Sequence, residues 1–174
     1  MGWRIKKTAL LAMLLALSLV LFVLEAQIPM PVFLPGAKPG FANIVTLVCL
    51  FFLSRREAFF VLFLRIVLSC VLSAGFAGFL YSVSGGLCSF FIMAAAMGRR
   101  RPGKLWLVSI LGGIFHNIGQ LLAAAFVLKS GAVFAYFPFL ILCGTVTGLV
   151  NGTAAGWIVQ NRHIRDLFKG LERV

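Results

Sequence analysis

Six apolar segments alternate with short polar or basic stretches along the 174-residue chain. The segments cover residues 8–28, 41–53, 58–72, 76–97, 105–128 and 135–160. A hydrocarbon core about 30 Å thick is crossed by roughly 20 helical residues, so most of the segments have spanning length. The pattern predicts an all-α integral membrane protein: a bundle of six transmembrane helices that forms a single domain over residues 1–174.

Two regions depart from regular spanning helices. The second segment, about 13 residues long, would cover only about 20 Å of the core. Residues 29–40, just before it, contain four prolines and two glycines, which exclude regular helix. We expect this stretch to fold over the outer mouth of the bundle, with a plain external connector as the alternative. Residues 75–86, rich in glycine and serine, predict a kinked or loosely wound turn.

The composition and the distribution of charge support this interpretation. Apolar residues make up 61% of the chain and charged residues 11%, which is not the balance of a soluble domain. Of the 16 lysines and arginines, 13 lie on the side of the N-terminus, two on the other side, and Arg65 within a span. Positive residues of this kind set membrane topology. Both termini are therefore expected in the cytoplasm and the protein in the cytoplasmic membrane, without a nucleic-acid partner.

The sequence offers little material for catalysis or metal binding. It has four acidic residues, and its four cysteines form no CxxC pair. His116 could act as a base, but only Cys70 or Glu25 could assist it at a similar depth. It also has no second histidine or cysteine beside it that could hold a metal. We expect no enzyme, no catalytic residues, no metal site and no cofactor.

Arg65 is the most unusual polar residue of the spans. It lies nine residues after Arg56, so about 13 Å along the helix and near mid-membrane, where an arginine is costly. Ser69 follows one helical turn later on the same face. Arg65 either binds an anionic ligand or locks helices together through carbonyl groups or Glu25, and the sequence leaves both interpretations open.

The fifth segment presents a polar face at a similar depth. Gly112, His116 and Gln120 are spaced i, i+4, i+8, and Asn117 lies beside them. The glycine permits close approach, so these side chains are typical of a cavity wall that binds ligand. The alternative is interhelical hydrogen bonding, at about 0.6 kcal/mol per bond.

Further polar residues near the outer surface complete the candidate ligand site. They are Lys38, Asn43 and Ser82. Lys38 is expected at the start of the second helix, where it would add positive charge to a helix N-terminus that already favours anions. Together with Arg65 and His116, it predicts a site for a small, anionic or polar ligand.

Small residues predict two helix contacts. The sixth segment has a glycine at every fourth position: Gly144, Gly148, Gly152 and Gly156. This spacing lets a neighbouring helix approach closely. The first segment carries Ala12 and Ala16, a common small-xxx-small motif that serves either internal packing or docking to another membrane protein.

Four stretches of the chain are distinctive. They read Pro-Gly-Ala-Lys-Pro-Gly-Phe-Ala-Asn at 35–43, Gly-Phe-Leu-Tyr-Ser at 78–82 with Gly85 and Gly86, His-Asn-Ile-Gly-Gln at 116–120, and Gly-Thr-Val-Thr-Gly at 144–148. They resemble the Gx transporter family, often labelled heptaprenyl diphosphate synthase component I, over about residues 7–160. That family is similar to the substrate-binding S components of energy-coupling factor (ECF) transporters, which are six-helix bundles with both termini inside.

The resemblance implies a function in transport. Ala12 and Ala16 match the motif that packs against a transmembrane coupling subunit, and residues 29–40 match the loop that closes over the substrate. The ATPase subunits would be other chains, since this sequence has no GxxxxGK[ST] motif. The ligand would be flavin-, quinone- or isoprenoid-related. The alternative is a non-catalytic membrane partner of a prenyl diphosphate synthase, because the single aspartate, Asp166, cannot form that enzyme's aspartate-rich motifs.

Overall fold

The computed structural model describes residues 2–27, 40–72, 76–98 and 102–172, and these residues are all-helical. The α-helices are α1 (Trp3–Ala26), α2 (Asn43–Phe52), α3 (Arg55–Leu72), α4 (Phe76–Ala96), α5 (Leu105–Leu128), α6 (Phe137–Gln160) and α7 (Arg162–Glu172). Short 3₁₀ helices, η1 (Pro102–Lys104) and η2 (Gly131–Tyr136), precede α5 and α6. The predicted all-α class is confirmed.

Among the described residues, four helical stretches are long and apolar enough to cross a membrane. They are Arg4–Glu25, Gly78–Ala96, Pro102–Leu128 and Gly131–Gln160. The other two predicted spans correspond to α2, which has 10 residues, and α3, which has 18 residues but four charged side chains, Arg65 among them. The structure therefore has four candidate spans where the sequence predicts six crossings.

The outside of the bundle is apolar. Val71 of α3, Phe126 of α5 and Trp157 of α6 are 83%, 76% and 78% exposed, respectively. Large apolar side chains gathered on the exterior mark a surface that faces something other than water. Together with the four long apolar helices, they indicate a multi-pass membrane protein.

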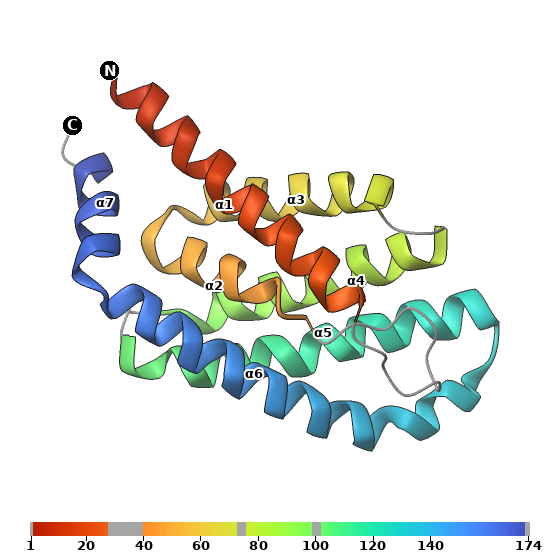
Figure 1. The fold of residues 1–174 in the computed structure, drawn as a ribbon. Helices are drawn as coiled ribbons and strands as arrows, with labels where there is room; N and C mark the ends of the chain where they lie inside the picture. Colours follow the sequence, from red (N-terminus) through yellow and green to blue (C-terminus); the bar gives the residue numbers. More distant parts are fainter. Residues whose placement is uncertain (1, 28–39, 73–75, 99–101, 173–174) are drawn as a thin grey trace.

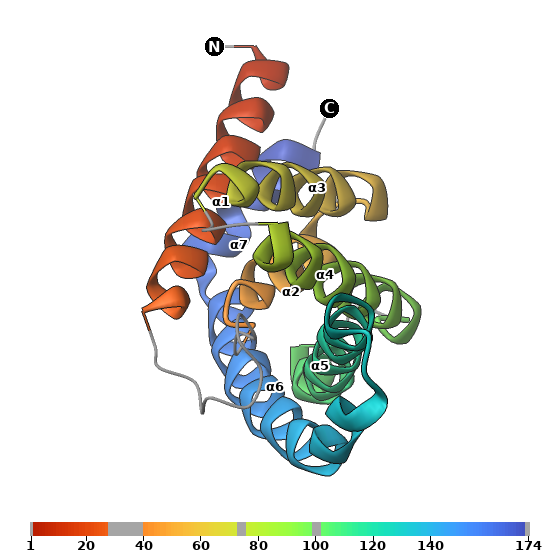
Figure 2. The ribbon, with the colours of Figure 1, turned by 90° about the vertical axis from the view of Figure 1, so that its right-hand side faces the viewer.

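The helices surround α2. The start of α1 and helix α7 lie at the same end of the molecule (Figure 1). Seen along the bundle, α3, α4, α5 and α6 follow one another in an arc, and α2 lies in the middle (Figure 2). Eight of the ten α2 residues are buried. A helix too short to span the core is thus the central element on which the longer helices pack.

Glycines bring α5 and α6 into backbone contact. A Cβ built on Gly144 would lie 2.7 Å from the Gly113 carbonyl oxygen. Those built on Gly148 and Gly152 would lie 2.6 and 2.5 Å from α5 Cα atoms. Gly156 differs, because a Cβ there would meet only a glutamine side chain, at 3.9 Å. Three of the four regularly spaced glycines of α6 therefore lie at this contact, and the fourth lies beyond it.

Helix α3 begins with a capping box that also binds α1. The Ser54 amide donates to Glu57 Oε2 over 3.0 Å, and the Glu57 amide donates to Ser54 Oγ over 3.3 Å. Lys7 of α1 forms an ion pair with the same carboxylate. Partial burial raises the pKa of Glu57, but the hydrogen bonds from Lys7 and Ser54 outweigh it and hold that pKa below its ordinary value.

Two local expectations were wrong. The predicted loosely wound turn over residues 75–86 is absent from its described part, where α4 is helical from Phe76 onward. Glycine and serine are accepted in a helix where tertiary packing supports it. The second helix begins at Asn43, after Gly40 with φ +85°, so Lys38 does not start it. Lys38 itself, and the predicted loop up to residue 39, lie outside the described residues.

The six predicted segments end at residue 160 and do not include α7. Ile164, Leu167 and Phe168 are spaced i, i+3, i+4, which is the signal of an amphipathic helix. The Phe168 ring stacks on Phe52 of α2 with a centroid distance of 4.1 Å. This contact anchors α7 to the central helix.

Candidate ligand-binding site

Polar side chains from five helices are buried within the bundle. Each is at most 5% exposed. The set comprises Glu25 of α1, Asn43 of α2, Arg65 of α3, His116 and Gln120 of α5, and Asn151 of α6. We call it the polar cluster. It includes four of the residues expected to bind ligand: Asn43, Arg65, His116 and Gln120.

His116 connects the elements of the polar cluster. Gln120 Nε2 lies 3.0 Å from His116 Nε2, within hydrogen-bonding distance. The ring lies between two glycines, since a Cβ would be 3.1 Å from Cδ2 at Gly40 and 2.9 Å from Cε1 at Gly85. His116 Nδ1 is buried and faces the backbone of Gly85, which interacts with the ring. His116 therefore connects α5 with the start of α2 and with the middle of α4.

Arg65 and His116 lie against adjacent glycines of helix α4. A Cβ built on Gly86 would be 3.1 Å from Arg65 Nη2. The adjacent glycine, Gly85, faces His116, so the pair leaves room for both side chains. Glu25 is close enough for its charge to act on Arg65, and its Oε2 accepts a hydrogen bond from the Ala42 amide over 3.2 Å. Glu25 thus provides the acidic partner that the helix-locking interpretation of Arg65 requires. The ligand-binding interpretation of Arg65 stands beside it.

Two asparagines leave acceptors unused. Asn151 Nδ2 donates to the Gly40 carbonyl over 3.0 Å and so connects α6 to the start of α2. Asn151 Oδ1 and Asn43 Oδ1 are buried and without hydrogen-bond partners among the described residues. An unsatisfied buried polar atom costs about 1–3 kcal/mol. Such atoms are normally satisfied by ordered water or by a ligand.

Three other predicted site residues are described and are not members of the polar cluster. Asn117 donates to the Leu140 carbonyl over 2.7 Å, which is an interhelical bond between α5 and α6. Ser69 is buried and donates to a backbone carbonyl of its own helix. Ser82 is buried on α4, three and four residues before the glycine pair, and so lies on the same helix face. Lys38 lies outside the described residues.

Sequence reasoning did not assign Gly40, Gly85, Gly86 or Asn151 to the site. The glycine pair was interpreted as a turn signal and as part of a family resemblance. Within a helix, a glycine pair can also leave space for a large side chain from a neighbouring helix. Asn151 lies beside the regularly spaced glycines of α6. Those glycines predicted how α6 packs, not which of its polar side chains face the site.

Ala12 and Ala16 are both exposed on α1. Their small side chains therefore form part of the outer surface of the bundle. This placement leaves room for another helix to approach them from outside.

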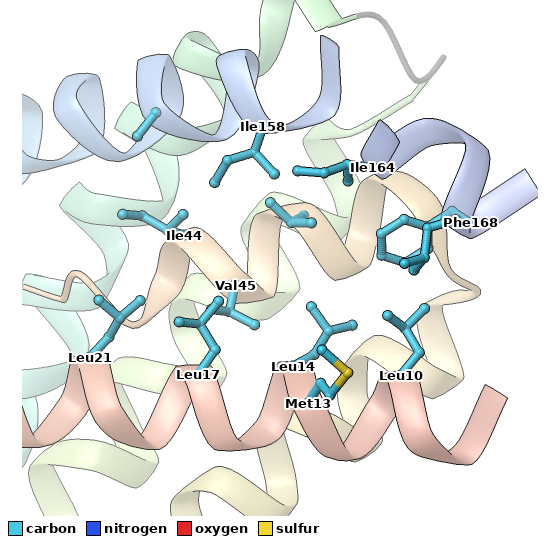
Figure 3. A pocket seen from close by; sticks show the side chains of 13 residues that line it. Leu10, Met13, Leu14, Leu17, Leu21, Ile44, Val45, Ile158, Ile164 and Phe168 are labelled. Atoms are coloured by element: carbon cyan, nitrogen blue, oxygen red, sulfur yellow. The ribbon is translucent and has the colours of Figure 1, made fainter. Parts of the chain in front are cut away.

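A separate cavity lies between α1, α2, α6 and α7, and we call it the α1–α7 cavity (Figure 3). Its volume is about 580 Å³. Its walls include Leu14 and Leu17 of α1, Val48 of α2, Ala154 of α6 and Phe168 of α7. None of the described residues that are expected to bind ligand lines it.

The fold and these sites define a multi-pass, all-helical membrane protein with a buried polar cluster. The chain belongs to the heptaprenyl diphosphate synthase component I family, whose model matches residues 14–158. This match confirms the expected family. Comparisons with curated proteins and with solved structures gave no match.

Proposed function

We propose that this chain is a substrate-binding, S-component-like subunit of an ECF-type transporter in the cytoplasmic membrane. It crosses the membrane six times with both termini in the cytoplasm, and the two crossings beyond the four candidate spans involve α2 and α3. It binds a small anionic or polar metabolite, related to flavins, quinones or isoprenoids, from the outer side. It is not an enzyme.

The observation that carries this proposal is the polar cluster. Arg65 supplies a buried positive charge, and His116 supplies a buried imidazole within the same interior. Intramembrane ionisable residues are costly and usually functional. The buried acceptors Asn43 Oδ1 and Asn151 Oδ1, which have no hydrogen-bond partner among the described residues, support a ligand that completes the hydrogen bonding.

The first test is mass spectrometry of small molecules extracted from the gently solubilised protein. A stoichiometric ligand is expected from the wild type and should be lost from Arg65→Ala and His116→Ala. Matched controls are Arg56→Ala and His163→Ala, because both side chains are exposed. If the cluster variants retain as much ligand as their controls, the polar cluster is not the binding site.

We propose further that Ala12 and Ala16 dock the transmembrane coupling subunit, while ATPases in separate chains drive transport. Ala12→Leu with Ala16→Leu should abolish association with that subunit, because larger side chains prevent close helix approach. Ligand binding should persist. Ala95→Leu with Ala96→Leu is the control, since these alanines are exposed on α4. Unchanged association of the α1 variant would exclude this docking role.

The second candidate is a non-catalytic membrane partner of a prenyl diphosphate synthase, which the family description favours. It predicts co-purification with a soluble synthase. It also predicts that this association does not depend on Ala12 or Ala16. The double variant Ala12→Leu with Ala16→Leu therefore separates the two candidates.

A further inference from the structure

The α1–α7 cavity is apolar throughout. All 13 side chains that line it are hydrocarbon or thioether groups. Figure 3 shows side chains of α1, α2, α6 and α7 pointing toward one another across the space. The volume of about 580 Å³ exceeds by several-fold that of a dry apolar cavity of about 150 Å³ that takes up benzene. A hydrocarbon ligand fits this lining, and water does not.

The cavity is open to the surface of the bundle along α1. Met13 and Leu17 are 67% and 50% exposed, whereas Val45 and Val48 of α2 behind them are buried. Helix α1 is one of the candidate membrane spans, so its exposed apolar face meets lipid chains. A membrane hydrocarbon chain can therefore enter from the side without crossing a polar surface.

Positive charge lies at one end of the cavity. Leu10 and Phe168 lie at that end, where α1 and α7 approach each other (Figure 3). Lys6 precedes Leu10 by one turn on the same face of α1. Arg165 is exposed on α7 beside its cavity-lining residues, and Lys169, also exposed, forms an ion pair with Asp166 over 3.9 Å. An amphipathic helix with basic residues at this level is suited to an anionic lipid surface.

We propose that the α1–α7 cavity binds one acyl chain of an anionic membrane phospholipid, with its head group held by Lys6 and Arg165. The apolar lining selects the chain, and the basic end selects the charge of the head group. This site is distinct from the polar cluster and does not depend on the transported ligand.

The test is native mass spectrometry of the full chain released from nanodiscs that contain equal amounts of phosphatidylglycerol and phosphatidylcholine with identical acyl chains. The wild type should retain one phosphatidylglycerol. Ala154→Phe fills the cavity and should lower the retained fraction about tenfold, since losing the burial of about two methylene groups already has this effect. Ala95→Phe, at an exposed position of α4, should leave retention unchanged.

A second pair of variants tests the head group without altering the cavity. Lys6→Gln with Arg165→Gln should remove the preference for phosphatidylglycerol, whereas Arg55→Gln with Lys104→Gln should keep it. Equal retention of both lipids by the wild type would refute the charge selection. Equal retention by Ala154→Phe and Ala95→Phe would overturn the cavity assignment. A Met13→Cys cross-link to another polypeptide, in place of retained lipid, would show instead that the cavity seats a protein helix.

Discussion

Replacing Gly113 by alanine tests the close contact between α5 and α6. The added Cβ would lie 2.2 Å from the Gly144 carbonyl oxygen and 3.2 Å from Gly148 Cα. Both atoms belong to the backbone, so no side-chain rotation relieves the overlap. The helices would have to separate by about 0.8 Å to restore a 3.0 Å contact. Overpacking of this kind costs about 3 kcal/mol, and the better helix propensity of alanine returns about 1 kcal/mol.

The expected loss in the free energy of unfolding is thus about 2 kcal/mol. Unfolding can be followed by titrating sodium dodecyl sulfate into dodecyl maltoside micelles. The fluorescence of Trp106 reports on the contact, because a Cβ on Gly152 would lie 2.5 Å from Trp106 Cα. Gly156→Ala is the matched control, since its Cβ meets nothing nearer than 3.9 Å. Equal stability of Gly113→Ala and Gly156→Ala would refute the proposed backbone contact.

Two further predictions concern the candidate site and the start of α3. Gly85→Ala would place a Cβ 2.9 Å from His116 Cε1. The displaced ring should weaken ligand binding about tenfold in an equilibrium binding assay, a loss of about 1.4 kcal/mol. The control Gly103→Ala, whose Cβ would meet nothing within 4 Å, should bind ligand normally in the same assay. Glu57 has a lowered pKa in the folded state, so its ion pair with Lys7 stabilises the protein above the ordinary value of 4.5 and is lost as the pH falls through the folded value. Glu57→Gln should remove that acid-sensitive component, worth less than about 1 kcal/mol, from detergent unfolding midpoints; an unchanged pH dependence would contradict the assignment.

The capping box and α7 illustrate signals that were present in the sequence but not used. Ser54 and Glu57 have the spacing of a capping box, and residues 162–172 alternate apolar and basic positions at helical spacing. Both are local features that depend on the chain near them. Their detection requires only the correct periodicity, not knowledge of the tertiary fold.

The sequence by itself determined the membrane class and helical segmentation, because bilayer hydrocarbon demands long apolar helices with satisfied backbones. It also placed Arg65, His116 and Gln120 on polar helix faces, since helical spacing alone decides which side chains share a face. The assignment to a family followed from short distinctive stretches such as residues 116–120.

Only the tertiary structure decided how those faces combine. It placed Gly85 and Gly86 against His116 and Arg65, and it turned Asn117 toward α6 rather than into the polar cluster. The choice depends on the rotation of each helix about its axis and on its neighbours, which neither periodicity nor composition specifies. The α1–α7 cavity has the same origin. Its walls come from α1 and α2 near the start of the chain and from α6 and α7 near its end, and the volume between them exists only once those helices are packed.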